Sequence, residues 1–110
     1  MVNIKSENGY SQVLDGIKIK TLVYGDNSLM SEFKMSAGST LPSHSHPYEQ
    51  TGYLVSGRII LHIGEEAHEM KSGYSWSVPA DVMHFAEIIE DSTAIEVFSP
   101  AREDYKKYHS

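Results

Sequence analysis

The amino-acid sequence predicts an all-β fold, either a sandwich or a barrel. Short apolar runs, alternating or continuous, recur along the chain and are separated by Gly, Asp or Pro. No segment shows the 3.6-residue apolar period of a helix packed on a core, and no internal repeat stands out. Short strands with regularly spaced turns are typical of sandwiches and barrels. A chain of 110 residues is expected to form one domain, residues 1–110, around a single core.

The first half of the chain predicts a hairpin. Residues 1–16 carry weak signals and are interpreted as an ordered lead-in. A strand over 17–24 alternates imperfectly and stops at the turn cluster Gly25-Asp26-Asn27, which predicts a hairpin connection. The following segment, 29–35, alternates cleanly and is therefore predicted to be a half-buried antiparallel strand. Its apolar face consists of Leu29, Ser31, Phe33 and Met35.

The second half predicts further short strands, at 59–63, 67–71, 74–78, 85–89 and 93–98. Tyr74 and Trp76 alternate with serines, so the two aromatic side chains are expected to share one face. A turn is expected at Glu90-Asp91. The one helix signal is terminal, where Ser99 as N-cap and Pro100 at the first helical position predict a short helix that includes Arg102, Asp104 and Lys107.

Composition restricts the partners and the chemistry. The absence of Cys excludes disulfides and thiolate metal sites, so any metal is held by nitrogen and oxygen. A net charge of −6 disfavours nucleic acid and anionic membranes as partners. The first 25 residues contain several charged groups and no apolar run that resembles a signal peptide or a membrane span. We therefore expect a cytoplasmic protein that binds a small molecule.

A metal site is predicted within residues 38–57. His44 and His46 are two residues apart, and such a pair shares one face only in an extended segment. Gln50 adds an uncharged amide ligand, whereas Glu49 lies at odd spacing and is expected to face away. His84, which ends a second strand-and-turn unit, is the candidate fourth ligand.

Two spaced motifs in this order resemble the cupin motifs. The first is Gly38, His44, His46, Gln50 and Gly57, and the second is Gly73, Pro79 and His84. Asp81 and Ile88 depart from the second motif, which usually has Gly and often Asn at these positions. The resemblance implies a double-stranded β-helix, the cupin jelly-roll barrel, with His44, His46, Gln50 and His84 as ligands that project into the barrel.

Three imidazoles and one amide leave the charge of a divalent cation uncompensated, so the bound ion is expected to act as a Lewis acid. Open coordination positions favour catalysis or ligand capture over a structural role. The donor set leaves the metal undecided among nickel, iron, manganese, zinc and copper.

The last strand supplies a candidate acid. Glu96 and Phe98 share one face and Ile95 and Val97 the other, which favours a Glu96 carboxyl in the barrel lumen as proton donor or acceptor. Arg102 is interpreted as folding back over the lumen to pair with an anionic substrate. The alternatives are a solvated glutamate on an edge strand and an arginine in an ordinary surface ion pair.

The segments IEVFSPAREDY and HSHPYEQ resemble the KdgF family of small cupins, which act on unsaturated monouronates released from pectin and alginate. The resemblance implies catalytic roles for Glu96, Phe98 and Arg102, with Glu96 in place of the family's usual Asp. It further implies a metal-dependent isomerase that converts cyclic 4,5-unsaturated uronates to linear 5-keto-4-deoxyuronate. Glu96 would handle the proton, Arg102 would orient the anion and Phe98 would form a wall.

Three other expectations accompany this interpretation. The same motifs occur in iron-dependent cupin dioxygenases, which would consume oxygen. They also occur in non-catalytic cupins that bind sugars or other small molecules. Sheet edges in small jelly rolls are often covered by a second subunit, so we expect a homodimer.

Overall fold

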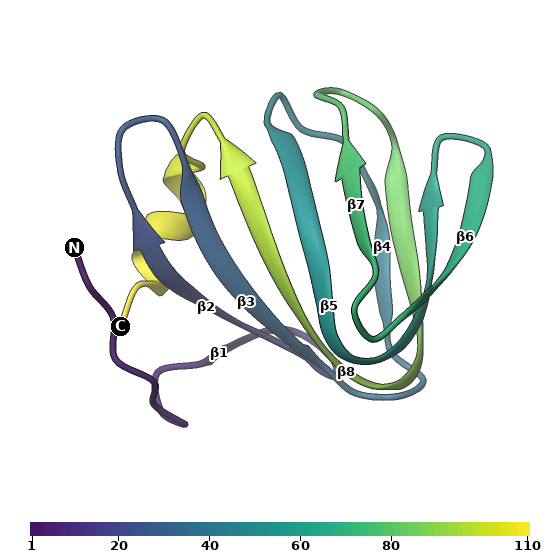
Figure 1. Cartoon of the computed structure of the whole chain (residues 1–110), viewed down its shortest axis with the longest axis horizontal. Helices are drawn as coiled ribbons and strands as arrows, with labels where there is room; N and C mark the ends of the chain where they lie inside the picture. Colours follow the sequence, from purple (N-terminus) through teal and green to yellow (C-terminus); the bar gives the residue numbers. More distant parts are fainter.

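The computed structural model describes all residues, 1–110, and consists of eight antiparallel strands and one short helix (Figure 1). The strands are β1 (Ser11–Leu14), β2 (Ile17–Tyr24), β3 (Leu29–Met35), β4 (Thr40–His44), β5 (Glu49–Ile63), β6 (Glu66–Lys71), β7 (Ser75–Val78) and β8 (His84–Ser99), and the 3-10 helix η1 is Glu103–Tyr108. The sheet order is β1-β2-β3-β8-β5-β6, with β4 paired to β8 and β7 paired to β5. The predicted all-β class with a short C-terminal helix is confirmed.

Two long bent strands, β5 and β8, connect the two halves of the fold (Figure 1). The expectation of separate strands in these regions, with a turn at Glu90-Asp91, is wrong. Both strands continue through the bend, where their register shifts near Ser56 and Arg58. Gly57 has a φ of 95°, and a Cβ there would lie 2.2 Å from the Ser92 hydroxyl. The Ser92 hydroxyl accepts from the Arg58 N–H at 3.1 Å and donates to the Glu90 carbonyl at 2.7 Å, so it satisfies backbone groups that the distorted ladder leaves free.

The core is built from the inward-facing residues of β2, β3, β5, β6 and β8. In β3 the predicted apolar face is confirmed, because Leu29, Ser31, Phe33 and Met35 are all buried. The main cluster consists of Ile17, Ile19, Phe33, Met35, Leu54, Ile59, Leu61, Met70, Ala86, Ile88 and Ala94. Each fully buried side chain of this size contributes about 1.5–3 kcal/mol.

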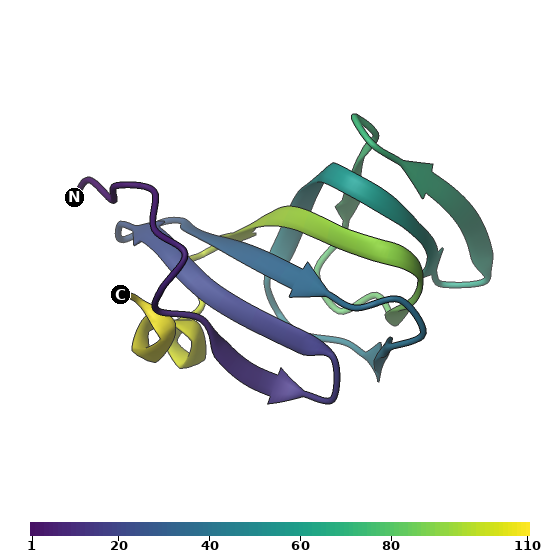
Figure 2. The ribbon, with the colours of Figure 1, turned by 90° about the horizontal axis from the view of Figure 1, so that it is seen from below.

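The C-terminal helix differs from the sequence prediction in position and type. Ser99 is the last residue of β8, and its hydroxyl donates to the Asn27 carbonyl at 2.9 Å rather than capping a helix. The 3-10 turn begins at Glu103, with Arg102 at its N-cap. It packs beside β2 (Figure 2), where the Thr21 hydroxyl donates to the Tyr105 carbonyl at 2.6 Å. At six residues it is the only helix, and none in the structure could cross a membrane.

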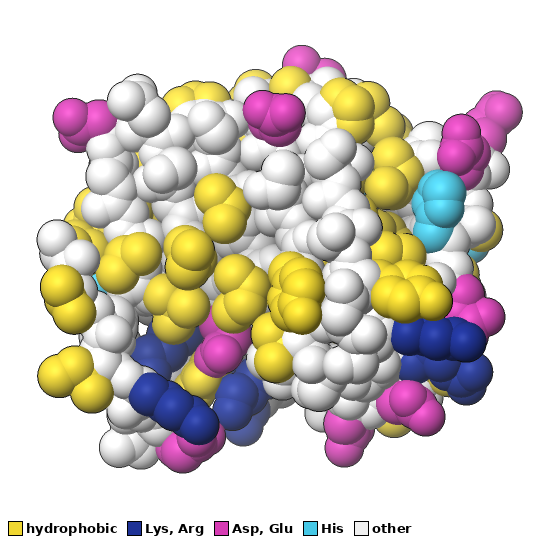
Figure 3. Space-filling model, in the orientation of Figure 1, with side chains coloured by type: hydrophobic (Ala, Val, Ile, Leu, Met, Phe, Trp, Pro, Cys, Tyr) yellow, Lys and Arg dark blue, Asp and Glu magenta, His cyan; other side chains and the backbone are white.

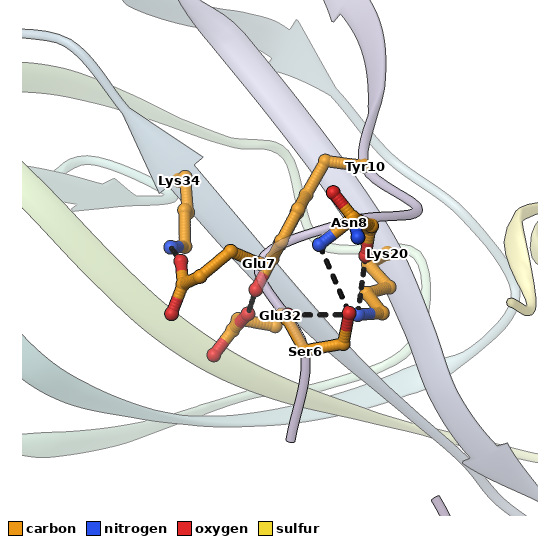
Figure 4. Close-up of polar contacts among 7 residues, drawn as sticks. All are labelled: Ser6, Glu7, Asn8, Tyr10, Lys20, Glu32 and Lys34. Carbon is orange, nitrogen blue, oxygen red and sulfur yellow. Dashed lines mark hydrogen bonds and ion pairs between the residues drawn. The ribbon is translucent and has the colours of Figure 1, made fainter. Parts of the chain in front are cut away.

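The N-terminal lead-in is held on the outer face of β2 and β3 by polar contacts (Figure 4). Lys20, which is only 2% exposed, donates to the carbonyls of Ser6 and Asn8 at 3.1 and 2.7 Å. The Tyr10 hydroxyl donates to the Glu32 carboxylate. These contacts lead the chain into β1, which pairs with β2 of the same chain.

Candidate metal centre and cavity

Three histidines meet where β4, β5 and β8 come together. His44 is the last residue of β4, and it lies opposite His84, the first residue of β8, in the ladder between the two strands. His46 lies beyond the end of β4, so the expected unbroken strand stops two residues early. Pro47 follows, and a proline cannot donate to a ladder. One nitrogen from each of the three imidazoles lies within 4.8 Å of the other two.

Backbone carbonyls orient all three rings in the same way. The Nδ1 atoms of His44, His46 and His84 lie 2.8, 3.0 and 2.8 Å from the carbonyl oxygens of Pro42, Tyr48 and Val82, respectively. A carbonyl oxygen can only accept, so each Nδ1 carries the proton and donates. Each Nε2 therefore presents a lone pair. This outer-shell hydrogen bond is the usual arrangement behind metal-bound histidines.

Two features of the Nε2 atoms fit a cation. His84 Nε2 is buried and has no hydrogen-bond partner. His46 Nε2 lies 3.0 Å from Gln50 Oε1, and with Nδ1 protonated this contact joins two acceptors. A cation between them would resolve the repulsion and would take its bonds at about 2.0–2.2 Å. The residues present thus fit a divalent transition metal held by His44, His46, His84 and Gln50.

Burial favours the neutral forms of His44 and His84. Desolvation lowers the pKa of both His44 and His84, although the carbonyls that accept from their Nδ1 atoms act in the opposite direction. The neutral ring is the form that binds metal, so the lowered pKa values of His44 and His84 favour the form of these two rings that can act as ligands.

Gln50 links the histidine cluster to a buried acid. Its Oε1 faces His46, and its Nε2 donates to Glu96 Oε2 at 2.8 Å. Glu96 is 7% exposed, so the alternative of a solvated glutamate does not apply. Burial raises the pKa of the Glu96 carboxyl to about 8, against the hydrogen bond from Gln50, which lowers it. Glu49, by contrast, is exposed.

An internal cavity of about 60 Å³ joins these groups. Its polar lining comes from His44, Gln50, His84, Glu96 and Arg102, and Phe98 is part of its apolar wall. Trp76 and Tyr105 also line it, and the sequence analysis assigned neither of them to the site. The alternation of Trp76 with serines was visible in the sequence, but Tyr74, its expected companion, lies outside β7 and is 49% exposed. Nothing in the sequence pointed to Tyr105.

Arg102 lies over aromatic rings at the cavity. Its guanidinium carbon is 3.8 Å from the ring centroid of Tyr105 and 5.1 Å from that of Phe98. Its Nε donates to Asp104 Oδ1 at 2.9 Å, and its side chain is only 14% exposed. Arg102 thus forms an ion pair with Asp104, as one of the two interpretations expected, and it also places a positive charge beside the cavity. Stacking on Tyr105 holds that charge in position.

The two departures from the second motif have structural explanations. Asp81 has a φ of 66°, a left-handed conformation that Gly adopts freely and that Asp tolerates better than most residues. Its backbone N–H donates to the His46 carbonyl at 2.8 Å, so this turn is tied to the loop that carries His46. Ile88 is part of the main core cluster, so its side chain contributes to packing rather than to the cavity.

These features define an antiparallel β-barrel with a three-histidine cluster suited to a metal. A family model described as a cupin domain matches residues 31–99, and the chain belongs to the cupin family. The predicted double-stranded β-helix is thereby confirmed.

Among its relatives, the chain is 28% identical to the pectin degradation protein KdgF of Dickeya dadantii (strain 3937) over 104 residues, which cover 93% of this chain and 94% of the relative. Its fold matches the solved structure of KdgF from Halomonas sp. with a TM-score of 0.90 at 28% identity, covering 94% and 96% of the two chains. A predicted oxalate decarboxylase from Thermotoga maritima shares the fold alone, with a TM-score of 0.80 at 18% identity and 91% and 99% coverage. The resemblance to the KdgF family is confirmed.

Proposed function

We propose that this cupin converts cyclic 4,5-unsaturated uronate monosaccharides to linear 5-keto-4-deoxyuronate. The observation that carries the proposal is the buried Glu96 carboxyl, which is joined through Gln50 to the three-histidine cluster and shares one cavity with Gln50, His44 and His84. The two KdgF relatives, which match nearly the whole chain, support the substrate class.

In this proposal His44, His46, His84 and Gln50 hold one divalent transition metal, of which nickel, iron, manganese and zinc are candidates. When bound, the metal supplies Lewis-acid polarisation of substrate oxygen atoms. Arg102 has terminal guanidinium nitrogens that its Nε–Asp104 contact leaves free to pair with the uronate carboxylate. Phe98 forms an apolar wall that limits water around Glu96.

The reaction is an isomerisation in which no atom is gained or lost. The C1 hydroxyl loses a proton, the bond between C1 and the ring oxygen breaks, and an aldehyde forms at C1. The electron pair left on the ring oxygen makes the ketone at C5, while C4 gains a proton. Glu96 donates that proton, which requires its acid form, and the proton released by the C1 hydroxyl, carried by water, restores that form. A pKa of about 8 keeps a large fraction of the carboxyl protonated at neutral pH.

The test follows the loss of ultraviolet absorbance of the C4–C5 double bond with metal-loaded protein, metal-stripped protein and buffer. We expect acceleration only with metal, and a large loss of turnover in Glu96→Gln. Glu49→Gln is the matched control, because Glu49 is an exposed acid next to Gln50 on β5. Near-normal turnover in Glu96→Gln would remove the acid step. No acceleration with any of the four metals would contradict the uronate proposal and favour an oxygen-dependent enzyme or a small-molecule-binding cupin.

We also propose a homodimer formed through the outer face of β3, β8 and β5. Met30, Tyr53 and Val55 on this face are 37%, 49% and 46% exposed, and Figure 3 shows hydrophobic side chains gathered in a band across it. Contiguous exposed apolar side chains mark interaction surfaces. Light scattering should give a dimer for the wild type and a monomer for Val55→Lys. A monomeric wild type would contradict this proposal.

A further inference from the structure

A row of inward-facing residues crosses the sheet beside the cavity. In the strand register Trp76 of β7 lies opposite Gly52 of β5, and Gly52 lies opposite Glu96 of β8. Trp76 and Glu96 are therefore separated by a residue without a side chain. Both line the cavity.

The indole ring occupies the space that Gly52 leaves. A Cβ at Gly52 would lie 2.2 Å from both Cε2 and Nε1 of Trp76 and 2.5 Å from Cζ2. The ring thus lies over the β5 backbone, with its nitrogen-bearing edge against Gly52, and extends from β7 toward β8. Any larger residue at position 52 would displace it.

The indole N–H of Trp76 makes no hydrogen bond in the structure, and the candidate acceptor in this row is the Glu96 carboxyl. Trp76 Nε1 is buried, and no acceptor meets hydrogen-bond geometry with it. Glu96, however, lies across Gly52 from Trp76 and lines the same cavity, and the indole N–H acts to lower the pKa of the Glu96 carboxyl. The Glu96 carboxyl is therefore the acceptor that this row of the sheet offers to the indole N–H. A buried donor without an acceptor is costly, and a carboxylate is a strong acceptor.

We propose that Trp76 is a positioning residue whose indole N–H donates a hydrogen bond to the Glu96 carboxyl, opposite the bond from Gln50, and that Gly52 makes room for it. Two donors from two directions prevent the carboxylate from rotating and aim it into the cavity. The hydrogen bond stands independently of the proposed function. Its consequence for catalysis rests on that function.

Nuclear magnetic resonance tests the bond directly. Trp76 is the only tryptophan, so the protein gives a single indole N–H signal. Glu96→Met removes both carboxyl oxygens at similar volume. We expect the indole proton signal to move upfield and its exchange with solvent to become about tenfold faster, as for loss of about 1.4 kcal/mol of protection. Glu87→Met, an exposed position on the same strand, should leave the signal unchanged. An unchanged signal in folded Glu96→Met would overturn the proposal.

Glu96→Gln provides a second measurement if the Met variant does not fold. Above pH 8, where the wild-type carboxyl is ionised, the bond in the variant goes to a neutral acceptor, so the indole signal should move in the same direction by a smaller amount. No movement would again overturn the proposed bond.

Kinetics test the positioning role. Trp76→Phe keeps an aromatic ring and loses the N–H, and kcat on the unsaturated uronate should fall about tenfold while KM changes less than about twofold. The control is Tyr74→Phe, which removes a hydroxyl from an exposed ring near the same strand. Full kcat in Trp76→Phe would overturn the positioning role. If the wild type itself shows no uronate turnover, the proposed function fails, and the resonance measurement still decides whether the bond exists.

Discussion

His44 and His84 occupy opposite positions in the ladder between β4 and β8, and their ring centroids lie 4.2 Å apart. Antiparallel pairing thus brings together two candidate ligands that are 40 positions apart in the chain. A metal held by both rings would cross-link β4 to β8. Metal binding should therefore stabilise the barrel as well as serve the reaction.

Substitution of His84 by Ala should weaken binding of Ni²⁺ or Zn²⁺ at least about 100-fold, since loss of a ligand costs more than loss of its outer-shell partner. Titration calorimetry on metal-stripped protein measures the change. At free metal 100 times the wild-type dissociation constant, the wild type should gain about 2.7 kcal/mol of stability, whereas the variant should gain about 0.4 kcal/mol or less. His62→Ala is the control, because His62 stacks on Phe85 at 3.9 Å and is not part of the three-histidine cluster. Unchanged affinity in His84→Ala would contradict the proposed ligand set.

Glu96 should make the metal-free protein less stable as the pH rises. Its folded-state pKa of about 8 lies above the ordinary glutamate value of 4.5, so the folded state binds the extra proton between these values. The stabilisation from the protonated carboxyl is complete below pH 4.5 and is lost as the pH rises through 8. Each unit of pKa difference corresponds to about 1.4 kcal/mol, so the total is a few kcal/mol.

Urea unfolding of the metal-free wild type and of Glu96→Gln at several pH values between 4.5 and 9 checks this prediction. The variant lacks the titrating group, so its free energy of unfolding relative to that of the wild type should increase with pH. Parallel stability curves for the two proteins across this range would show that the Glu96 carboxyl does not titrate as described.

Gly57→Ala should destabilise the fold by more than about 2 kcal/mol, because a side chain at this position is both strained and overpacked. Gly57 has a φ of 95°, and its Cβ would lie 2.4 Å from the Asp91 carbonyl oxygen as well as close to Ser92. Gly25→Ala is the matched control, since nothing lies within 4 Å of its Cβ position. Denaturant unfolding should show a change of about 0.5 kcal/mol or less for the control. Equal effects of the two substitutions would mean that the bend does not depend on Gly57.

Arg102→Lys should raise KM for the unsaturated uronate about tenfold with a smaller effect on kcat. Lysine keeps the charge but loses both the planar stacking on Tyr105 and the paired donors for a carboxylate. Steady-state kinetics measure the split between KM and kcat. Lys107→Gln, a change of charge on the same C-terminal segment, should leave KM unchanged. An unchanged KM in Arg102→Lys would place the substrate carboxylate elsewhere.

Much of the fold and part of the site follow from local pattern. The alternation in 29–35 predicted β3 with its buried face, and the turn cluster after Tyr24 predicted the β2–β3 hairpin. Side chains two apart share a face of an extended segment, so local spacing also placed Glu96 with Phe98, both of which are buried.

Local pattern failed where distant segments override it. The turn expected at Glu90-Asp91 is part of a continuous strand because Gly57 and Ser92 bend β5 and β8 together. Ser99 does not cap a helix because the Asn27 carbonyl, 72 positions away, accepts its hydroxyl. A short stretch of sequence does not show which distant residues will contact it in the fold.

By itself, the sequence determined the all-β class, the donor types and the strand faces, since these depend on side-chain chemistry and on the two-residue period of a strand. The tertiary structure decided which donors converge and what surrounds them. It set the shared Nδ1 orientation of the three imidazoles, the bridge from His46 through Gln50 to Glu96, and the indole of Trp76 over Gly52. Strand register and the burial of charge fix these relationships, and both depend on contacts between residues far apart in the chain.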